Sequence, residues 1–281
     1  MISPPARARI ARSVAPSPMA LWLMVLITAT GIAAPLTAQE LSSEQIAAQL
    51  AAAAKQSRQP DFSGRDLSGL DLSGFDFLSA NLRGAILKNA DLSNSNLRGI
   101  EAQKADLSGA NLSGSNLDLA ILRGAKLVEA DLRNVSAFST VFAESDMTGS
   151  DLRGSRLVSN FDRAKLQGAN LSGAVLAADM KNQPMGLMRV SLVKADLTGA
   201  NLENADLAMG MLEFADFTGA RLTGANLRRV EAAGARFSGA NLSGAIFRGA
   251  DIESARFTGA TGIEQIIDLD QALNLTSAVF D

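Results

Sequence analysis

Large apolar residues recur at every fifth position over most of the chain, with small and polar residues between them in a fixed order. Residues 105–117 read ADLSGANLSGSNL, so that a small residue, Asp or Asn, Leu, Ser and a small residue or Gly follow one another and repeat. The apolar centres keep this spacing over residues 62–157, slip back by one residue for 161–176, and resume over 187–257. A period of five matches neither an α-helix, at about 3.6 residues per turn, nor a strand of period two. It fits a chain that turns a corner every five residues, with the apolar centre and the small residue inside.

The residues beside each centre suit such corners. Asp or Asn most often precedes the centre and can hydrogen-bond nearby backbone, and the Gly that follows accepts a positive φ. Four sides would close one coil in about 20 residues, and stacked coils would pair their backbones at about 4.8 Å, as neighbouring strands do. Phe217, Phe237 and Phe257 are spaced to lie on one inner face of successive coils. We therefore expect their rings to stack as a ladder.

The recurring A(D/N)LXX motif resembles that of the pentapeptide-repeat family, and the resemblance covers residues 60–260. It implies an all-β solenoid, a right-handed quadrilateral β-helix of about ten coils with short α-helical caps at both ends. The four sides and the handedness are implied by the resemblance, and the five-residue period is consistent with them. The array is expected over residues 61–260, interrupted by a loop at 177–186.

A short amphipathic helix is predicted within residues 39–60, directly before the array. Ser42 can cap it, with Gln45 in capping-box position. Ile46, Leu50 and Ala54 are spaced for one apolar face. Such a helix would cover the otherwise open first coil of a solenoid.

A second cap is predicted over residues 261–281. Thr261 and Glu264 have capping-box spacing, and apolar residues follow at helical intervals. Those taken for one helical face are Ile263, Ile266, Ile267 and Leu273, and Leu275 and Phe280 are taken for two final pseudo-repeats. The cap is expected to protect the last coil from edge-to-edge association, with homodimerisation as its alternative role.

The N-terminal segment predicts export. Arg7, Arg9 and Arg12 precede an apolar run at 19–27, and small residues follow up to Ala38. This order is typical of a secretory signal peptide, here residues 1–38 with cleavage after Ala38. The apolar stretch is short for a membrane span, which needs roughly 20 residues, and an uncleaved anchor is the alternative. The mature protein is then expected in the periplasm or secreted, without a membrane span.

Composition narrows the chemistry. The chain has no His, Cys or Tyr, which removes imidazole- and thiol-based catalysis, His or Cys metal sites and disulfides. The formal net charge is −3, and the three leader arginines offset part of a more acidic remainder. A mildly acidic array disfavours direct binding to nucleic acid. We expect no catalytic residues, no cofactor and no metal.

Two departures from the pattern are candidates for partner contact. The first is an outward-facing apolar patch at the junction of the fourth and first sides, made of Leu119, Ile121, Phe138, Val141 and Val158. Its alternative is that distorted coils tuck some of these residues inward. The second is the 177–186 loop with Met180, Pro184 and Met185, which leaves the same junction one coil later. A neutral insertion is the alternative for the loop.

A polar ladder is expected on the third side. Paired carboxylates could in principle serve glycoside hydrolysis or bind Ca²⁺, but Asp at this position belongs to the repeat itself. Arg133 and Arg153 also stand two residues after ladder carboxylates. The ladder residues are Asp71, Asp91, Asn111, Asp131, Asp151 and Asn170.

The function expected from these features is an exported, non-enzymatic scaffold that contacts an unknown protein or envelope component. A regular solenoid offers long faces but no deep apolar pocket with converging polar groups. The alternative, implied by the family resemblance, is a DNA-mimicking protein that binds gyrase or topoisomerase and confers drug resistance. The export signal and the many basic residues oppose that alternative.

Overall fold

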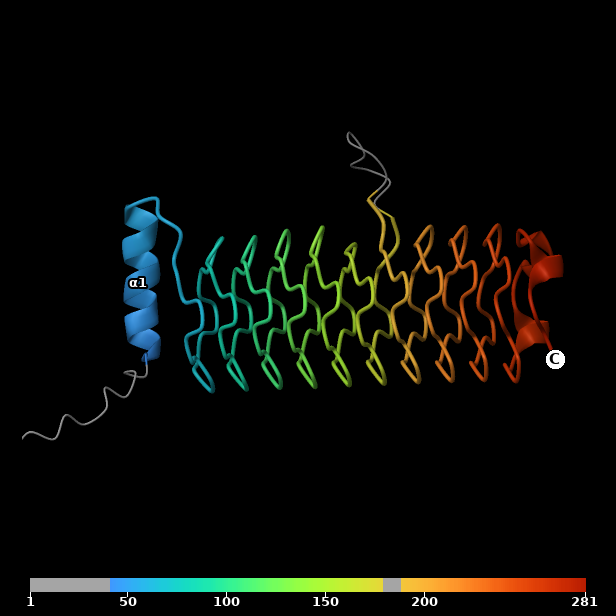
Figure 1. The fold of residues 1–281 in the computed structure, drawn as a ribbon, viewed down its shortest axis with the longest axis horizontal. Helices are drawn as coiled ribbons and strands as arrows, with labels where there is room; N and C mark the ends of the chain where they lie inside the picture. The colour runs from blue at the N-terminus through green and yellow to red at the C-terminus, as the bar shows by residue number, and fades with distance from the viewer. Residues whose placement is uncertain (1–40, 179–187) are drawn as a thin grey trace, which may run out of the picture. The chain divides into compact units, whose positions relative to one another are not determined.

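The computed structural model of the chain describes residues 41–178 and 188–281. These residues belong to one compact unit, Glu40–Asp281. The unit begins with helix α1 (Ser43–Lys55) and continues as stacked coils, which follow one another from blue to red in Figure 1. The predicted signal peptide and the loop residues Met180, Pro184 and Met185 lie outside the described residues. None of the helices in the described part of the chain has the length and apolar character that a membrane span requires.

Four ladders of isolated parallel bridges join successive coils, so each coil has four sides. The ladder of side A runs through Asp61, Asn81, Glu101, Ile121, Val141, Asn160, Ser191, Met211, Glu231, Asp251 and Leu273. Sides B, C and D begin at Asp66, Asp71 and Asp76 and follow the same register. Sides A to D correspond to the first to fourth sides of the sequence prediction. We name each corner by the sides it joins, so that corner DA lies between sides D and A.

Each corner is a tight turn that the sequence motif builds directly. The apolar centre opens it: the Phe62 carbonyl accepts a hydrogen bond from the Arg65 N–H at 3.1 Å, and Gly64 between them has φ +64°. A positive φ at the third residue is the requirement of a type II turn. The carboxylate of Asp61 accepts the Ser63 N–H at 3.0 Å. The residue before the centre therefore ties the turn from outside while the centre packs inside.

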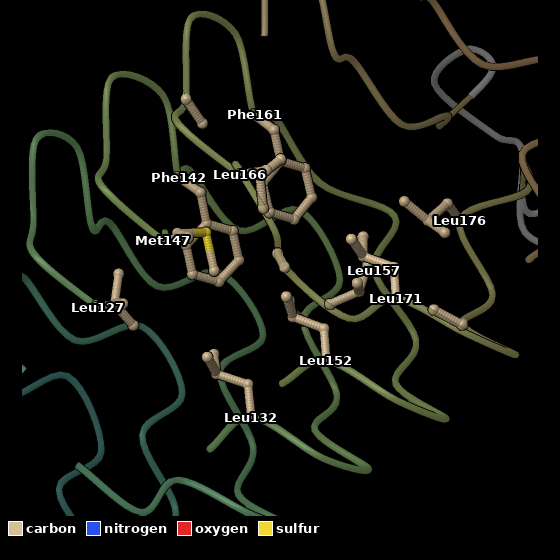
Figure 2. Packing of buried hydrophobic residues seen from close by; sticks show 14 of the residues in the cluster. Leu127, Leu132, Phe142, Met147, Leu152, Leu157, Phe161, Leu166, Leu171 and Leu176 are labelled. Carbon is tan, nitrogen blue, oxygen red and sulfur yellow. The ribbon is translucent and has the colours of Figure 1, made fainter. Parts of the chain in front are cut away.

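The interior is a continuous column of Leu, Phe, Ile and Ala side chains. Figure 2 shows Phe142 and Phe161 side by side among inward-pointing leucines, and their ring centroids are 4.9 Å apart. The predicted ladder of Phe217, Phe237 and Phe257 is confirmed, because both centroid distances are 5.1 Å and the rings are nearly parallel. Each fully buried Leu or Phe contributes about 1.5–3 kcal/mol of gross stabilisation.

The stacking register changes near the middle of the array. Val141 pairs with Asn160 instead of a residue twenty positions on, so this coil is one residue short. Asn160 then pairs with Ser191, so the next coil carries the insertion. The insertion leaves at corner DA, where it breaks the row of turns (Figure 1). The centre predicted at Leu187 lies outside the described residues, and the ladder of side A resumes at Ser191.

Helix α1 covers the first coil. Ser42 and Gln45 form the predicted capping box, and Ile46 and Leu50 are buried in the core cluster. The third buried position is Ala53 rather than the predicted Ala54, which is exposed. The helix thus removes the open end of the apolar column from water.

The predicted α-helix after residue 261 is wrong. The chain instead forms three short 3₁₀ helices, η1 (Ile263–Gln265), η2 (Leu269–Gln271) and η3 (Leu275–Ser277). A left-handed residue precedes each one, namely Gly262, Asp268 and Asn274. A left-handed residue at every sixth position interrupts any α-helix and lengthens each side from five residues to six.

The lengthened sides continue the ladders of the array. Ile267 and Leu273, expected on an apolar helix face, are exposed ladder residues instead. Phe280 follows the ladder residue Val279 and stacks on Phe257 at 4.7 Å between ring centroids. The end of the chain is therefore a modified coil rather than a helical plug.

Candidate functional site

A hollow of about 280 Å³ lies at corner DA, where the coils change register. Its wall includes Val141, Val158, Met188 and Met211. The coil that ends at Asn160 is one residue short, so the usual two-residue turn is missing here. The hydroxyl of Ser159 donates to the carbonyl of Ala137, as the hydroxyl of Thr140 does to the Leu117 carbonyl one coil earlier. The hollow thus lies where the shortened corner and the insertion meet.

The structure brings the predicted apolar patch together, with one correction. The Leu119 N–H donates to the Phe138 carbonyl at 2.8 Å, and Ile121 pairs with Val141 on side A. Leu119 is 48% exposed. The Phe138 ring is half-buried, and the Arg156 guanidinium carbon lies over it, 5.6 Å from the ring centroid. Val158 was expected to face outward, but it is only 2% exposed because the shortened corner folds it inward.

Met188, Arg189 and Met211 line the hollow and were not predicted. Arg189 reaches across two coils, where its Nη1 lies 2.5 Å from Glu231 Oε1 and its Nη2 lies 3.2 Å from Oε2. Met211 occupies an ordinary ladder position in the motif, and its neighbour across the coils, Ser191, precedes it by one coil. Only the register across the insertion shows that these residues meet Val141 and Val158.

The second residue after each centre must adopt a positive φ, and we call it the turn position. The corners differ in the residue types that occupy this position. At corners BC and CD this position holds Gly or Asn, with Glu129 as the exception. At corner DA it is taken by Ser79, Leu119, Ser139, Met209 and Arg229 as well as Gly. At corner AB it is taken by Lys104, Glu144, Arg163, Lys194, Phe214 and Ser254 as well as Gly.

Large side chains at these positions are costly. A left-handed conformation costs a residue with a Cβ about 1–2 kcal/mol, and such strain is concentrated at functional sites. Leu119 (φ +61°), Met209 (φ +63°) and Phe214 (φ +58°) adopt it while displaying apolar side chains. Phe214 is 59% exposed, so burial in the core does not compensate for the strain. The two corners that border side A are therefore specialised.

Corner AB carries a second, polar hollow of about 270 Å³. Arg123 and Glu144 pair across it at 2.9 Å. Asp162 accepts hydrogen bonds from the Ser191 hydroxyl and, at 3.2 Å, from the Val193 N–H. The Lys194 ammonium lies 5.9 Å from the centre of the Phe214 ring. The carboxylates of this hollow are thus engaged within the chain.

The acidic ladder of side C is structural. Arg133 Nη2 lies 2.6 Å from Asp131 Oδ2, and Arg153 makes the same contact with Asp151. The hydrogen bond from Arg133 lowers the pKa of Asp131, against the opposing effect of burial. Among residues 41–178 and 188–281, acidic side chains form no group of three that could hold a metal ion. These carboxylates fasten turns and bind neighbouring arginines.

A family model described as pentapeptide repeats matches the chain in eight copies, over residues 61–99, 103–136, 159–177, 187–224 and 225–261. The chain belongs to the pentapeptide-repeat family. Pentapeptide repeats form a right-handed quadrilateral β-helix, in agreement with the four ladders. No protein with a curated description matches the chain.

Several solved structures of pentapeptide-repeat proteins are similar to the chain. HetL, involved in heterocyst differentiation regulation in Nostoc sp. strain PCC 7120, is 28% identical, with 85% of this chain and 94% of HetL covered and a TM-score of 0.48. Full-length QnrB1, a plasmid-mediated fluoroquinolone resistance protein, is 24% identical, with 79% and 92% covered and a TM-score of 0.30. Rfr23 from the cyanobacterium Cyanothece 51142 is 29% identical, with 42% and 64% covered and a TM-score of 0.17.

Proposed function

We propose that this pentapeptide-repeat protein is an exported, non-enzymatic scaffold whose side A contacts a protein or a component of the cell envelope. The observation that carries the proposal is the placement of strained, large turn residues. They border side A almost exclusively, and the hollow at corner DA lies between them. A scaffold without a partner would gain nothing from placing strained, large residues mainly at these two corners.

The absence of enzymatic activity is part of the proposal. The chain contains no His, Cys or Tyr, and the hollows at corners DA and AB are shallow surface features. The carboxylates of side C that could form an acid–base pair are bound by Arg133 and Arg153. Recognition through a rigid surface needs none of the missing groups.

Export is the second part of the proposal, and it rests on the predicted signal peptide at residues 1–38. Cell fractionation and N-terminal sequencing of the mature protein test it. The expected result is a periplasmic or secreted chain that begins at Gln39. An uncut chain in the cytoplasm would contradict export and would favour the DNA-mimicking, gyrase-binding alternative.

Contact through side A is tested in living cells with a photo-crosslinking amino acid at position 119 or 214. The matched control carries it at position 114, a turn position of corner CD occupied by Gly. We expect specific crosslinked products from the two side A positions and none from the control. Equal crosslinking from all three positions would contradict a role of side A.

A homodimer through the C-terminal end is a further part of the proposal. Ile267, Leu273 and Val279 are exposed ladder residues on this last coil. Light scattering of the purified chain tests this arrangement. The substitution Leu273→Lys is expected to convert a dimer to a monomer, and a wild-type monomer at high concentration would refute it.

A further inference from the structure

Corner DA, which borders side A, has an apolar part and a basic part. The apolar part is the hollow at corner DA with Val141, Val158 and Met211. The basic part follows directly, because the Met209 N–H donates to the Arg228 carbonyl at 2.8 Å and the turn of Arg228 and Arg229 therefore stacks on that of Met209. The two parts are neighbours along corner DA.

The two arginines of the basic part are not neutralised by neighbouring acids. Glu231 is held by Arg189 at 2.5 Å, and Asp268 is held by Arg248 at 3.0 Å. The carboxylate of Asp206 accepts a hydrogen bond from the side-chain amide of Asn226 at 2.8 Å. Arg228 and Arg229 form no ion pair with a carboxylate of any residue that the structure describes, although Arg228 reaches the Asn226 oxygen at 3.3 Å. Arg229 also occupies a strained turn position, with φ +52°.

From this arrangement we propose that corner DA binds an extended protein segment that combines an apolar side chain with nearby carboxylates. The inference rests on the proposed function and specifies its partner. The apolar side chain enters the hollow, and the carboxylates meet Arg228 and Arg229. Guanidinium–carboxylate contacts are strong, charge-assisted hydrogen bonds, and Arg is enriched at the energetic centres of interfaces.

The dimensions of the surface suit a peptide. Successive coils are about 4.8 Å apart, so the middle of the hollow lies two coils, roughly 10 Å, from the arginine turn. An extended chain covers that distance in about three residues. The hollow, at about 280 Å³, is below the range of roughly 300–1,000 Å³ that holds drug-sized ligands. It is large enough for one side chain but not for a whole lipid acyl chain.

Peptide selection on the immobilised full-length mature protein tests the proposal. The probe is a library of random dodecapeptides displayed on phage. We expect enriched peptides to carry a Leu, Met or aromatic residue with Asp or Glu two to four positions away. Enriched peptides without acidic residues would overturn the proposal.

Charge reversal supplies the matched variants. Arg228→Glu with Arg229→Glu is expected to weaken binding of a selected peptide at least tenfold in fluorescence polarisation. Glu stands at the position equivalent to Arg228 in Glu203 and Glu253, and at the turn position of Arg229 in Glu129 and Glu144, so the fold tolerates both changes. The control is Arg163→Glu at the same turn position of corner AB, and it is expected to leave binding unchanged. An equal loss with the control would refute corner DA as the site.

Vesicles with anionic headgroups provide the competing outcome. Arginine-dependent binding to these vesicles without selection of acidic peptides would overturn the peptide proposal in favour of a lipid surface. The crosslinking experiment distinguishes failure of the acidic-partner proposal from failure of the proposed scaffold function. Crosslinks from side A that persist in the charge-reversed variant would refute the acidic partner and leave the scaffold function standing. No crosslinks from side A would refute the scaffold function itself.

Discussion

Corners BC and CD and the two corners that border side A perform the same backbone turn with different residues. At BC and CD, Gly or Asn meets the requirement for a positive φ at almost no cost. At DA and AB, larger residues such as Leu119 and Phe214 adopt the same conformation with strain. One half of the surface therefore follows the needs of folding, and the other half departs from them. The departure, rather than the regular repeat, indicates where a partner binds.

The largest effect is expected where an aliphatic residue of the regular half is replaced by Asp. Leu112 is a fully buried centre of side C, whereas Leu119 is a turn residue of corner DA. Leu112→Asp should lower the free energy of unfolding by about 4 kcal/mol or more, because it creates a cavity and buries an unpaired charge. Leu119→Asp should change it by less than about 1 kcal/mol, since Asp accepts the left-handed region more readily than Leu. Chemical denaturation of both variants measures the difference. Equal losses would show that the two leucines are not differently placed.

A smaller effect isolates the backbone cost of the turn position. Gly219 at corner BC has φ +66°, and an added Cβ there meets no atom within 4 Å. Gly219→Phe should therefore lower stability by about 1 kcal/mol through strain alone. Phe214→Gly at corner AB should raise it by a similar amount while weakening partner capture. A stability loss in Phe214→Gly would mean that the exposed ring stabilises the fold, and the argument from strain would fail.

The five-residue period predicts the coils and the phenylalanine ladder, because each apolar centre in the regular register stacks on the equivalent centre of the next coil. Counting coils along the repeat predicted that the residues of the apolar patch would meet at corner DA. It did not predict that Val158 points inward. A one-residue deletion removes the ordinary two-residue turn, and the motif alone does not show that Val158 then folds inward. Met188 and Met211 meet Val158 only across the insertion, whose register the motif does not reveal.

The C-terminal end shows a different limit. Residues 261–278 contain a six-residue repeat in which Gly262, Asp268 and Asn274 are left-handed. Their apolar spacing also fits a helix, so periodicity alone could not separate the two structures. The recurrence of Gly, Asp and Asn at six-residue intervals was the signal for turns. The turn positions of corners BC and CD carry the same kind of signal, since they hold Gly or Asn.

Low pH should destabilise the fold through the carboxylates of the polar ladders, and the apolar part of side A should contribute nothing to this loss. Hydrogen bonds from Ser73 lower the pKa of Asp71, and the hydrogen bond from Arg133 lowers that of Asp131. A carboxylate with a lowered pKa in the folded state stabilises the protein above its unfolded pKa of about 3.9, and this stabilisation is lost as the pH falls through the folded value. Stability should therefore decline below about pH 4, which denaturation at a series of pH values measures. Asp71→Asn with Asp131→Asn should flatten the decline, whereas Ile121→Val on side A should not alter its slope. An unchanged slope in the double variant would assign acid sensitivity to other carboxylates.

The smallest effect concerns Glu129, the exception among the turn positions of corners BC and CD. It has φ +57°, and its side chain lies over Gly149 in the next coil. Because corner BC does not border side A, no binding role compensates for its strain. Glu129→Asn should raise stability by about 0.5 kcal/mol, since Asn tolerates the left-handed region. It should leave both peptide binding and crosslinking from side A unchanged. Loss of partner capture in this variant would extend the contact surface to corner BC and remove the contrast between the two halves.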